Sequence, residues 1–440
     1  MEYGTVAGLA GIGAMLGLIL FAGMSPGLAM LLAGTCGCLA MVPPSGWHAL
    51  WTGTTGMEVW NVFSNYGFTV IPLFVLLGEA MYHAGYSERL FDAARTWFGE
   101  RRGGLAITTL LASAGFSAIC GSNTATAATM GCVALPPMTK AGYHRPLKCG
   151  AVAVGSTLGA VIPPSIVLVV YGLYTGVSIS KLFAGSLLPG GLLAAAFAAT
   201  VSILCRFHPD WAPGGRRHSW GERFRSLSGV AETAVLFGLV MGAMFTGVVT
   251  PTEAAGFGAF AGIGWCLLRG HLGMKGLAAS LTATLHVSGM VFLILAGATV
   301  FGRFLVLTRL PFDLADAVAG ASMPPHAVLA AIALCYLLGG CLMDSLAFLM
   351  ISLPLFGPLV QRLGFDLVWF GQVVCMVTTL GAVTPPVGVS SFVVAGMAKD
   401  TSAGEVFRGC AWFLPAYLFA FGMLMLFPHG MVGWLAELVQ

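Results

Sequence analysis

Long apolar stretches alternate with short polar ones along almost the whole chain. A helix needs about 20 apolar residues to cross the hydrocarbon core of a membrane. Ten stretches approach this length with few or no charged side chains, so we predict ten membrane-crossing segments. Their approximate bounds are 4–23, 25–42, 67–84, 148–172, 183–205, 230–248, 251–268, 278–307, 368–397 and 409–428.

Lysine and arginine are concentrated in some of the connections between these segments. Five connections hold 16 of the 20 basic residues, and they lie at 86–104, 139–149, 205–226, 269–275 and 399–408. Connections rich in positive charge stay in the cytoplasm. We therefore predict that these five lie inside and that, with ten crossings, both termini are periplasmic.

Two segments, 103–139 and 328–360, do not fit this scheme as simple crossings. The first carries no charge, yet both of its flanks are basic, so a single crossing would put one flank on the wrong side. Each arm has about 14 residues, or about 21 Å of helix, which is too short for a core of about 30 Å. We predict a re-entrant helical hairpin at each segment.

The chain also contains two copies of one pattern. Residues 158–164 (LGAVIPP) match 380–386 (LGAVTPP) at an offset of 222 residues, and the same offset pairs the polar hairpin tips at 122–123 and 344–345. A Pro-Pro pair unwinds a helix inside a crossing. The two copies enter from opposite sides, which indicates an inverted-topology repeat whose site lies near the midplane. An old duplication with purely structural kinks is the alternative.

The composition supports a lipid environment. Hydrophobic residues make up 58% of the chain and charged residues 8%, against about 25% charged in a typical soluble domain. The net charge of +3 is too small to indicate nucleic-acid binding. The eleven cysteines lie mostly in apolar runs and are interpreted as packing residues. The N-terminus has no basic region typical of a signal peptide. We expect an all-α polytopic membrane protein.

Polar residues at the first tip and break are candidate ion or substrate ligands. Hydroxyl, amide and carbonyl oxygens are the hard ligands that an alkali cation prefers. The candidates are Ser122, Asn123, Thr124, Gly159, Pro163, Pro164 and Ser165. Capping of two short helices is the structural alternative for the Ser/Asn/Thr cluster.

The second tip and break supply the symmetry-related candidates. Asp344 is the one charge in the second hairpin, and a carboxylate at membrane depth is by default functional. The candidates are Asp344, Ser345, Thr384, Pro385, Pro386 and Gly388. The predicted sodium ligands across both copies are Ser122, Asn123, Asp344, Ser345 and Thr384. Asp344 could instead cap a helix in a wet pocket.

Three other ionisable residues in apolar surroundings are given structural interpretations. Thr250-Pro251-Thr252-Glu253 fits a capping box that begins a helix. Glu79 is interpreted as a residue at the inner membrane edge. His286 is interpreted as a hydrogen-bonded packing residue rather than a proton relay.

Over about residues 65–420 the chain resembles the large membrane subunit of the tripartite ATP-independent periplasmic (TRAP) transporters. The matching stretches are 71–74 (IPLF), 102–106 (RGGLA), 121–128 (GSNTATAA), 162–165 (IPPS), 171–172 (YG), 250–255 (TPTEAA), 343–344 (MD) and 384–388 (TPPVG). One departure is Asn123, where many members have a second serine. Asparagine still offers a carbonyl ligand.

The resemblance implies an elevator-type sodium symporter of the ion-transporter superfamily in the bacterial inner membrane. Such a symporter would import small organic acids, such as C4-dicarboxylates or sugar acids, with Na⁺ as the coupling ion and no other cofactor. A periplasmic binding protein would deliver the substrate, and a small four-helix membrane subunit, expected as a separate chain, would support the large one.

These considerations predict seven segments with different roles. They are N-terminal scaffold helices (1–84), an inner-interface amphipathic arm helix (85–104), the first hairpin and broken helix (105–182), scaffold helices (183–277), a second-repeat helix with an outer arm (278–327), the second hairpin and broken helix (328–397) and a C-terminal helix (398–440). A self-sufficient divalent-anion/sodium symporter is one alternative. A membrane-embedded hydrolase is another, but the chain lacks Gly-x-Ser-x-Gly and His-Glu-x-x-His patterns, so we do not expect an enzyme.

Overall fold

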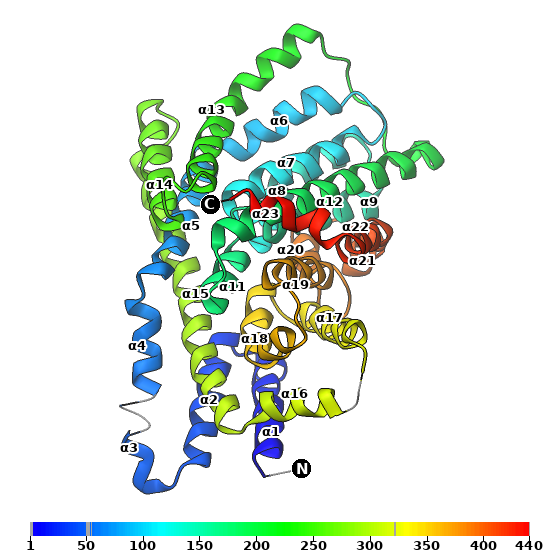
Figure 1. The fold of residues 1–440 in the computed structure, drawn as a ribbon. Helices are drawn as coiled ribbons and strands as arrows, with labels where there is room; N and C mark the ends of the chain where they lie inside the picture. Colours follow the sequence, from blue (N-terminus) through cyan, green and yellow to red (C-terminus); the bar gives the residue numbers. More distant parts are fainter. Residues whose placement is uncertain (1–2, 50–52, 54, 321–322, 440) are drawn as a thin grey trace. The chain divides into compact units, whose positions relative to one another are not determined.

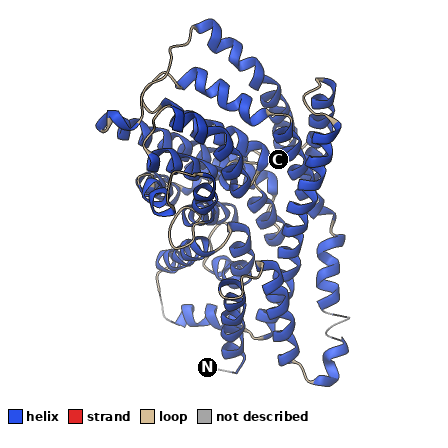
Figure 2. Cartoon of the chain, turned by 180° about the vertical axis from the view of Figure 1, so that it is seen from behind, coloured by secondary structure: helices blue, strands red, loops and turns tan. Residues whose placement is uncertain are grey.

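The computed structural model describes all residues except 1–2, 50–52, 54, 321–322 and 440, and its described part contains helices and no strands (Figure 2). By its internal contacts the chain divides into two compact units. The smaller consists of residues 1–69, 285–336 and 346–367, and the larger of 70–284, 337–345 and 368–440. The seven predicted segments describe roles in transport, which this division does not test.

The smaller unit contains the first helices and most of the second-repeat hairpin (Figure 1). Its elements are α1 (Tyr3–Leu20), α2 (Pro26–Met41), η1 (Pro44–Gly46), α3 (Trp47–Ala49), α4 (Gly56–Ser64), η3 (Tyr66–Thr69), most of α15 (Met274–Leu307), α16 (Leu310–Gly320), the start of α17 (Pro325–Leu342) and nearly all of α18 (Ser345–Arg362). Helix α2 packs closely on α15, because a Cβ atom at Gly34 would lie 2.8 Å from the backbone of Phe301.

The larger unit contains the first hairpin, both broken helices and the end of the chain. Its elements are α5 (Val70–His83), α6 (Tyr86–Phe98), α7 (Gly104–Cys120), α8 (Asn123–Lys140), α9 (Arg145–Ser156), α10 (Leu158–Val161), α11 (Ile166–Thr175), α12 (Ile179–Phe207), η4 (Pro209–Trp211), α13 (Trp220–Phe245), α14 (Pro251–Leu268), α19 (Leu367–Gly381), α20 (Val389–Met397), α21 (Ala403–Ala411), α22 (Leu414–Leu426), η5 (His429–Gly433) and α23 (Trp434–Glu437).

The predicted helix–turn–helix form of both hairpins and the two breaks are confirmed, but the arms are longer than the roughly 14 residues predicted. Helices α17 and α18 have 18 residues each and are long and apolar enough to cross a membrane. Residues 103–139 fold as α7 and α8 with a turn at 121–122, and residues 328–360 lie within α17 and α18 with a turn at 343–344. The first broken helix is interrupted at 162–165, between α10 and α11, and the second at 382–388, between α19 and α20. The peptide bonds Pro163–Pro164 and Pro385–Pro386 are both cis.

Five helices in the described part are long and apolar enough to cross a membrane, and three bent helix pairs raise this number to eight. The count is below the ten predicted because several apolar helices, such as α2 with 16 residues, are shorter than a full crossing. The predicted C-terminal helix is bent by 46° between α21 and α22.

Two close approaches hold the first and second repeats together within the larger unit. Helices α9 and α21 cross with their backbones in contact, because a Cβ atom at Gly150 would lie 2.5 Å from the backbone carbon of Gly409. Nearby, the buried Lys148 of α9 donates to the carboxylate of Asp400, which follows α20, at 2.6 Å.

Candidate functional site

The tip of the first hairpin is a tight turn with polar side chains. Helix α7 ends at Gly121, which has a φ of +64°, a conformation that glycine adopts without a steric cost. Ser122 is extended and caps α8, because its hydroxyl accepts from the amide of Ala125 at 3.5 Å. The same hydroxyl lies 3.2 Å from that of Thr124. The capping role is therefore present, and it leaves oxygen lone pairs available at the tip.

The first break lies directly against this tip. The amide of Ile166 donates to the carbonyl of Gly121 at 3.3 Å. A Cβ atom at Gly159 would lie 3.0 Å from the carbonyl oxygen of Ser122, and one at Gly121 would lie 2.6 Å from the carbonyl oxygen of Pro164. Both glycines are needed for this approach. The tip residues Ser122 and Asn123 thus lie against Gly159, and the carbonyl of Pro164 lies against Gly121.

One buried oxygen at this tip lacks a partner. Asn123 is 5% exposed, and its side-chain oxygen accepts no hydrogen bond from any residue that the structure describes. Ser165 is fully buried, and its hydroxyl caps α11 by accepting from the amide of Leu168 at 3.4 Å. A buried acceptor without a partner costs about 1–3 kcal/mol. A cation would satisfy this oxygen, so the residues fit a sodium ligand set.

The second tip and break meet in a related way. The amide of Gly388 donates to the carbonyl of Cys341 at 2.9 Å, as Ile166 does to Gly121 in the first copy. A Cβ atom at Gly381 would lie 2.6 Å from the backbone carbon of Gly340, so glycine is again required where hairpin and break touch. The donors Ile166 and Gly388 match at the offset of 222 residues, but the acceptor Cys341 lies two residues before the position that matches Gly121, so the two junctions are related without being identical.

Polar groups gather at this second junction too. Asp344 is half-buried between α17 and α18, and the hydroxyl of the buried Ser345 has no hydrogen-bond partner within the described chain. The hydroxyl of Thr384 donates to the carbonyl of Leu380 at 2.6 Å. Gly388 has a φ of +55° and sits where a Cβ atom would lie 2.9 Å from the Thr384 carbonyl oxygen.

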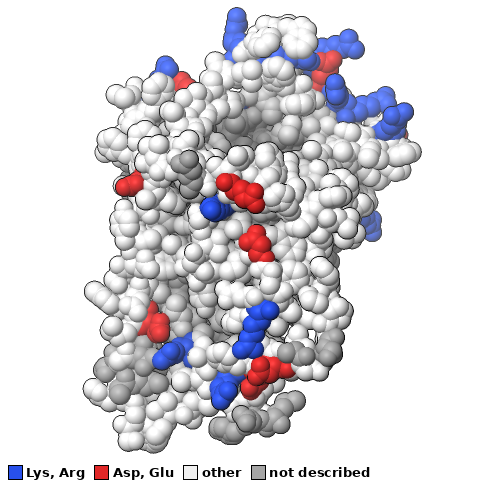
Figure 3. Space-filling view, viewed as in Figure 1, with Lys and Arg blue, Asp and Glu red and all other residues white. Residues whose placement is uncertain are grey.

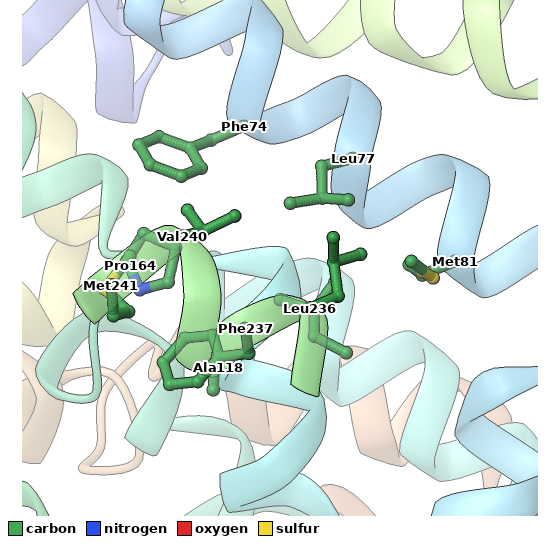
Figure 4. A pocket seen from close by; sticks show the side chains of 10 residues that line it. Phe74, Leu77, Met81, Ala118, Pro164, Leu236, Phe237, Val240 and Met241 are labelled. Atoms are coloured by element: carbon green, nitrogen blue, oxygen red, sulfur yellow. The ribbon is translucent and has the colours of Figure 1, made fainter. Parts of the chain in front are cut away.

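The two breaks differ in exposure. Pro163 and Pro164 are buried, whereas Pro385 and Pro386 are exposed. A cavity of about 20 Å³ lies beside Pro164, and its lining is entirely apolar, with Phe74 of α5 and Phe237 of α13 among its side chains (Figure 4). Such a cavity offers no ligand to an ion. The oxygen atoms at the tips and breaks remain the candidate ligands.

The structure also describes the three ionisable residues that were given structural interpretations, Glu253, Glu79 and His286. Glu253 is confirmed as part of a capping box with Thr250, whose hydroxyl accepts from the Glu253 amide at 3.3 Å. Glu79 is half-buried with His83 at 3.9 Å. The interpretation of His286 as a hydrogen-bonded packing residue is wrong: its side chain is exposed and forms no hydrogen bond with a described residue.

Sequence reasoning missed the pair formed by Lys148 and Asp400. Lys148 is 1% exposed and also donates to the hydroxyl of Thr139 at 2.8 Å, while Arg145 lies 3.9 Å from Asp400. The available signal was a lysine inside the end of a predicted crossing, where an ionisable residue is by default functional or paired.

The family to which the chain belongs follows from its match to known proteins. A family model described as "Tripartite ATP-independent periplasmic transporter, DctM component" matches residues 12–429. The chain is a member of this family. The predicted resemblance is confirmed, and the chain is a transporter component in a multi-pass membrane fold rather than an enzyme.

Individual relatives agree with this membership. The chain is 28% identical over 374 residues to the C4-dicarboxylate TRAP transporter large permease protein DctM of Pseudomonas aeruginosa, covering 82% of this chain and 85% of that one. It is 34% identical over 331 residues to the isethionate TRAP transporter permease protein DctMQ of Oleidesulfovibrio alaskensis, covering 75% of this chain and 52% of the relative.

A solved structure shares the fold. The Alcanivorax borkumensis YdaH transporter, described as having an unusual topology, superposes with a TM-score of 0.57 and 14% sequence identity. The match covers 90% of this chain and 91% of that one. At this identity the likeness concerns the fold alone.

Proposed function

We propose that this DctM-family chain is the large permease subunit of a sodium symporter that imports small organic acids across the bacterial inner membrane. The observation that carries the proposal is the pair of related tip–break junctions. Each has a buried oxygen without a partner in the described chain, on Asn123 in the first copy and Ser345 in the second. Both relatives named above carry anions according to their printed names, a C4-dicarboxylate and isethionate.

Sodium would be held by oxygen atoms of the two junctions. Ser122 and Asn123 would act at the first, together with the carbonyls of the break that ends at Ser165. Asp344, Ser345 and Thr384 would act at the second. Oxygen ligands of this kind suit a hard cation. Filling both junctions would fix each hairpin tip against its break and so prepare a binding site for an anionic substrate.

Alternating access would follow from an elevator motion of the two hairpins and broken helices. This is supported by the packing of α20 and α21 from the second repeat on α8 and α9 from the first, which would let both junctions move together. The basic connections would stay cytoplasmic, and the termini would then be periplasmic.

Two partners complete the proposed transporter. A periplasmic binding protein would deliver the substrate, as the family description "tripartite" and "periplasmic" favours. A small membrane subunit would complete the permease. The DctMQ relative supports a second membrane part of this kind, since the match spans only 52% of its length.

Reconstituted uptake tests the proposal. Proteoliposomes would contain this chain, the small subunit and the binding protein, and uptake of the ligand bound by that binding protein would be measured with and without a sodium gradient. We expect uptake to require both the gradient and the binding protein. Uptake that requires the sodium gradient but not the binding protein would favour a self-sufficient symporter. Uptake by an intact complex at the same rate with and without the gradient would refute the proposed ion sites.

A further inference from the structure

Three basic segments of the larger unit converge on one pocket of about 400 Å³. The end of α6 contributes Arg95, the base of the first hairpin contributes Lys140, and the connection from α12 to α13 contributes Arg216 and His218. These segments are widely separated in sequence, and Figure 3 shows Lys and Arg side chains gathered at the end of this unit. The positive-inside rule predicts a cytoplasmic location for all three.

Three cations of this pocket form no close ion pair with the part of the chain that the structure describes. Arg95, Lys140 and Arg216 are exposed, and none forms an ion pair with a described residue. Two carboxylates close in sequence to the pocket residues have defined partners. Glu100 lies 2.7 Å from Arg223 and 3.4 Å from Arg217, both outside the pocket lining.

The second carboxylate, Glu222, accepts from the backbone amide of Ser219 at 2.8 Å and lies 3.5 Å from His218. Glu222 therefore interacts with both His218 and Arg216, and Arg95 and Lys140 are the cations of the pocket lining for which the described residues provide no close carboxylate. A cavity lined by one sign of charge focuses its field on ligands of the opposite sign.

The walls of the pocket are fixed by backbone hydrogen bonds. The amide of Gly215 donates to the carbonyl of Gly99 at 3.0 Å, and the amide of Gly103 donates to the carbonyl of Ala212 at 3.3 Å. The hydroxyl of Tyr143 accepts from the amide of Leu105 at 3.1 Å. The α12–α13 connection is therefore held against the hairpin base, and the pocket is formed before a ligand arrives.

Aromatic side chains place this pocket at the level of lipid headgroups. Trp97, two residues after Arg95, packs edge-on against Trp220 and Phe224 with ring centroids 6.4 and 6.0 Å apart. Trp220 and Phe224 are 65% and 63% exposed. Exposed tryptophans of this kind are enriched at the interface between membrane and water.

We propose that this pocket binds the phosphate-bearing headgroup of an anionic phospholipid such as phosphatidylglycerol. Arginine matches phosphate oxygens with paired N–H donors, and basic pockets between helices at the cytoplasmic face recognise anionic headgroups. Leu105, Pro136 and Pro137 give the same pocket an apolar wall for the start of the acyl chains. A free phosphate ion has the same charged group as the headgroup, but it has no acyl chains to contact this apolar wall. The aromatic side chains at the membrane interface would not favour it either.

The test is a binding titration of the delipidated full-length chain, followed by native mass spectrometry. The probes are dihexanoyl-phosphatidylglycerol, dihexanoyl-phosphatidylcholine and inorganic phosphate. The pocket variant combines Arg95→Gln, Lys140→Gln and Arg216→Gln. The control variant combines Arg225→Gln, Lys275→Gln and Lys399→Gln, which removes the same charge from exposed positions outside the pocket.

We expect phosphatidylglycerol to bind the natural chain and the control alike, and the pocket variant about tenfold or more weakly. Lys140→Gln alone should weaken binding by about fivefold, and this single variant provides the test if the triple variant fails to fold. Equal binding of phosphatidylcholine, equal weakening in the control, or full competition by inorganic phosphate at matched concentration would each overturn the proposal.

Discussion

The buried ion pair that joins the two repeats offers a direct test of how the larger unit is held together. Lys148 donates to Asp400 at 2.6 Å and to Thr139 at 2.8 Å, and its side chain is 1% exposed. Asp400→Asn would remove the counter-charge and leave the ammonium buried. Breaking a buried pair from one side costs about 3–5 kcal/mol.

Solvent reduces this cost. The Asp400 side chain is 38% exposed, so water screens the pair and we expect a loss of about 2 kcal/mol, or roughly 30-fold in the unfolding equilibrium. Lys148→Met removes the buried charge and retains an unbranched apolar chain, so it should cost only about 1 kcal/mol. The double variant should be no worse than Lys148→Met alone, which gives a coupling energy of about 2 kcal/mol.

The assay is the free energy of unfolding in mixed micelles, measured by far-UV circular dichroism during a denaturant titration. Asp210→Asn is the matched control, because Asp210 is exposed and forms no ion pair with a described residue. Additive losses in the double variant, or a loss at Asp400 as small as at Asp210, would refute the reasoning.

The same pair has a defined pH dependence. The hydrogen bond from Lys148 holds the pKa of Asp400 below its usual range. A depressed folded-state pKa gives stability that is complete above the unfolded value of about 3.9 and is lost as the pH falls through the folded value. The difference between the natural chain and Asp400→Asn should therefore be constant from about pH 7 to 5 and shrink below about pH 4.

Three further predictions concern the first junction and a helix start. Gly159→Ala should lower sodium-driven uptake by about tenfold or more, since its Cβ atom would press on the hairpin tip, whereas Gly191→Ala, with open space around it, should leave uptake unchanged. Asn123→Ala should weaken the apparent sodium affinity in uptake without lowering stability in the absence of sodium; unchanged sodium dependence would exclude it as a ligand. Thr250→Ala should cost about 1 kcal/mol of unfolding free energy by removing the cap that bonds Glu253, and a loss of uptake at unchanged stability would contradict the capping role.

Local patterns made much of the fold predictable from the sequence. A proline pair disfavours the helix that precedes it, and a polar segment between two basic flanks favours a turn, so the breaks and hairpins could be predicted. A proline pair alone does not decide the matter, because Pro136 and Pro137 lie inside α8 without interrupting it. The capping box at Thr250 was predictable for the same reason, since its partners are three residues apart.

Contacts between distant residues were not predictable in this way. Lys148 and Asp400 are 252 positions apart, and the residues around either one give no indication of its partner. The convergence of Arg95, Lys140 and Arg216 likewise depends on how the α12–α13 connection folds back. For His286 the apolar neighbours suggested burial, but a membrane helix is apolar on all sides, so its sequence does not show which side packs on the protein.

The crossing of α9 and α21 has a consequence for genetics. A Cβ atom at Gly409 would lie 2.0 Å from the carbonyl oxygen of Pro146, and the opposing surface is backbone rather than side chain. The effect of a larger residue in a core is often suppressed by a second substitution that makes a neighbouring side chain smaller. Here the neighbouring atoms belong to the backbone, so no such substitution is available. Suppressors of Gly409→Ala should therefore be absent from α9 at the crossing itself, and selection for them would reveal which distant positions let the two repeats separate.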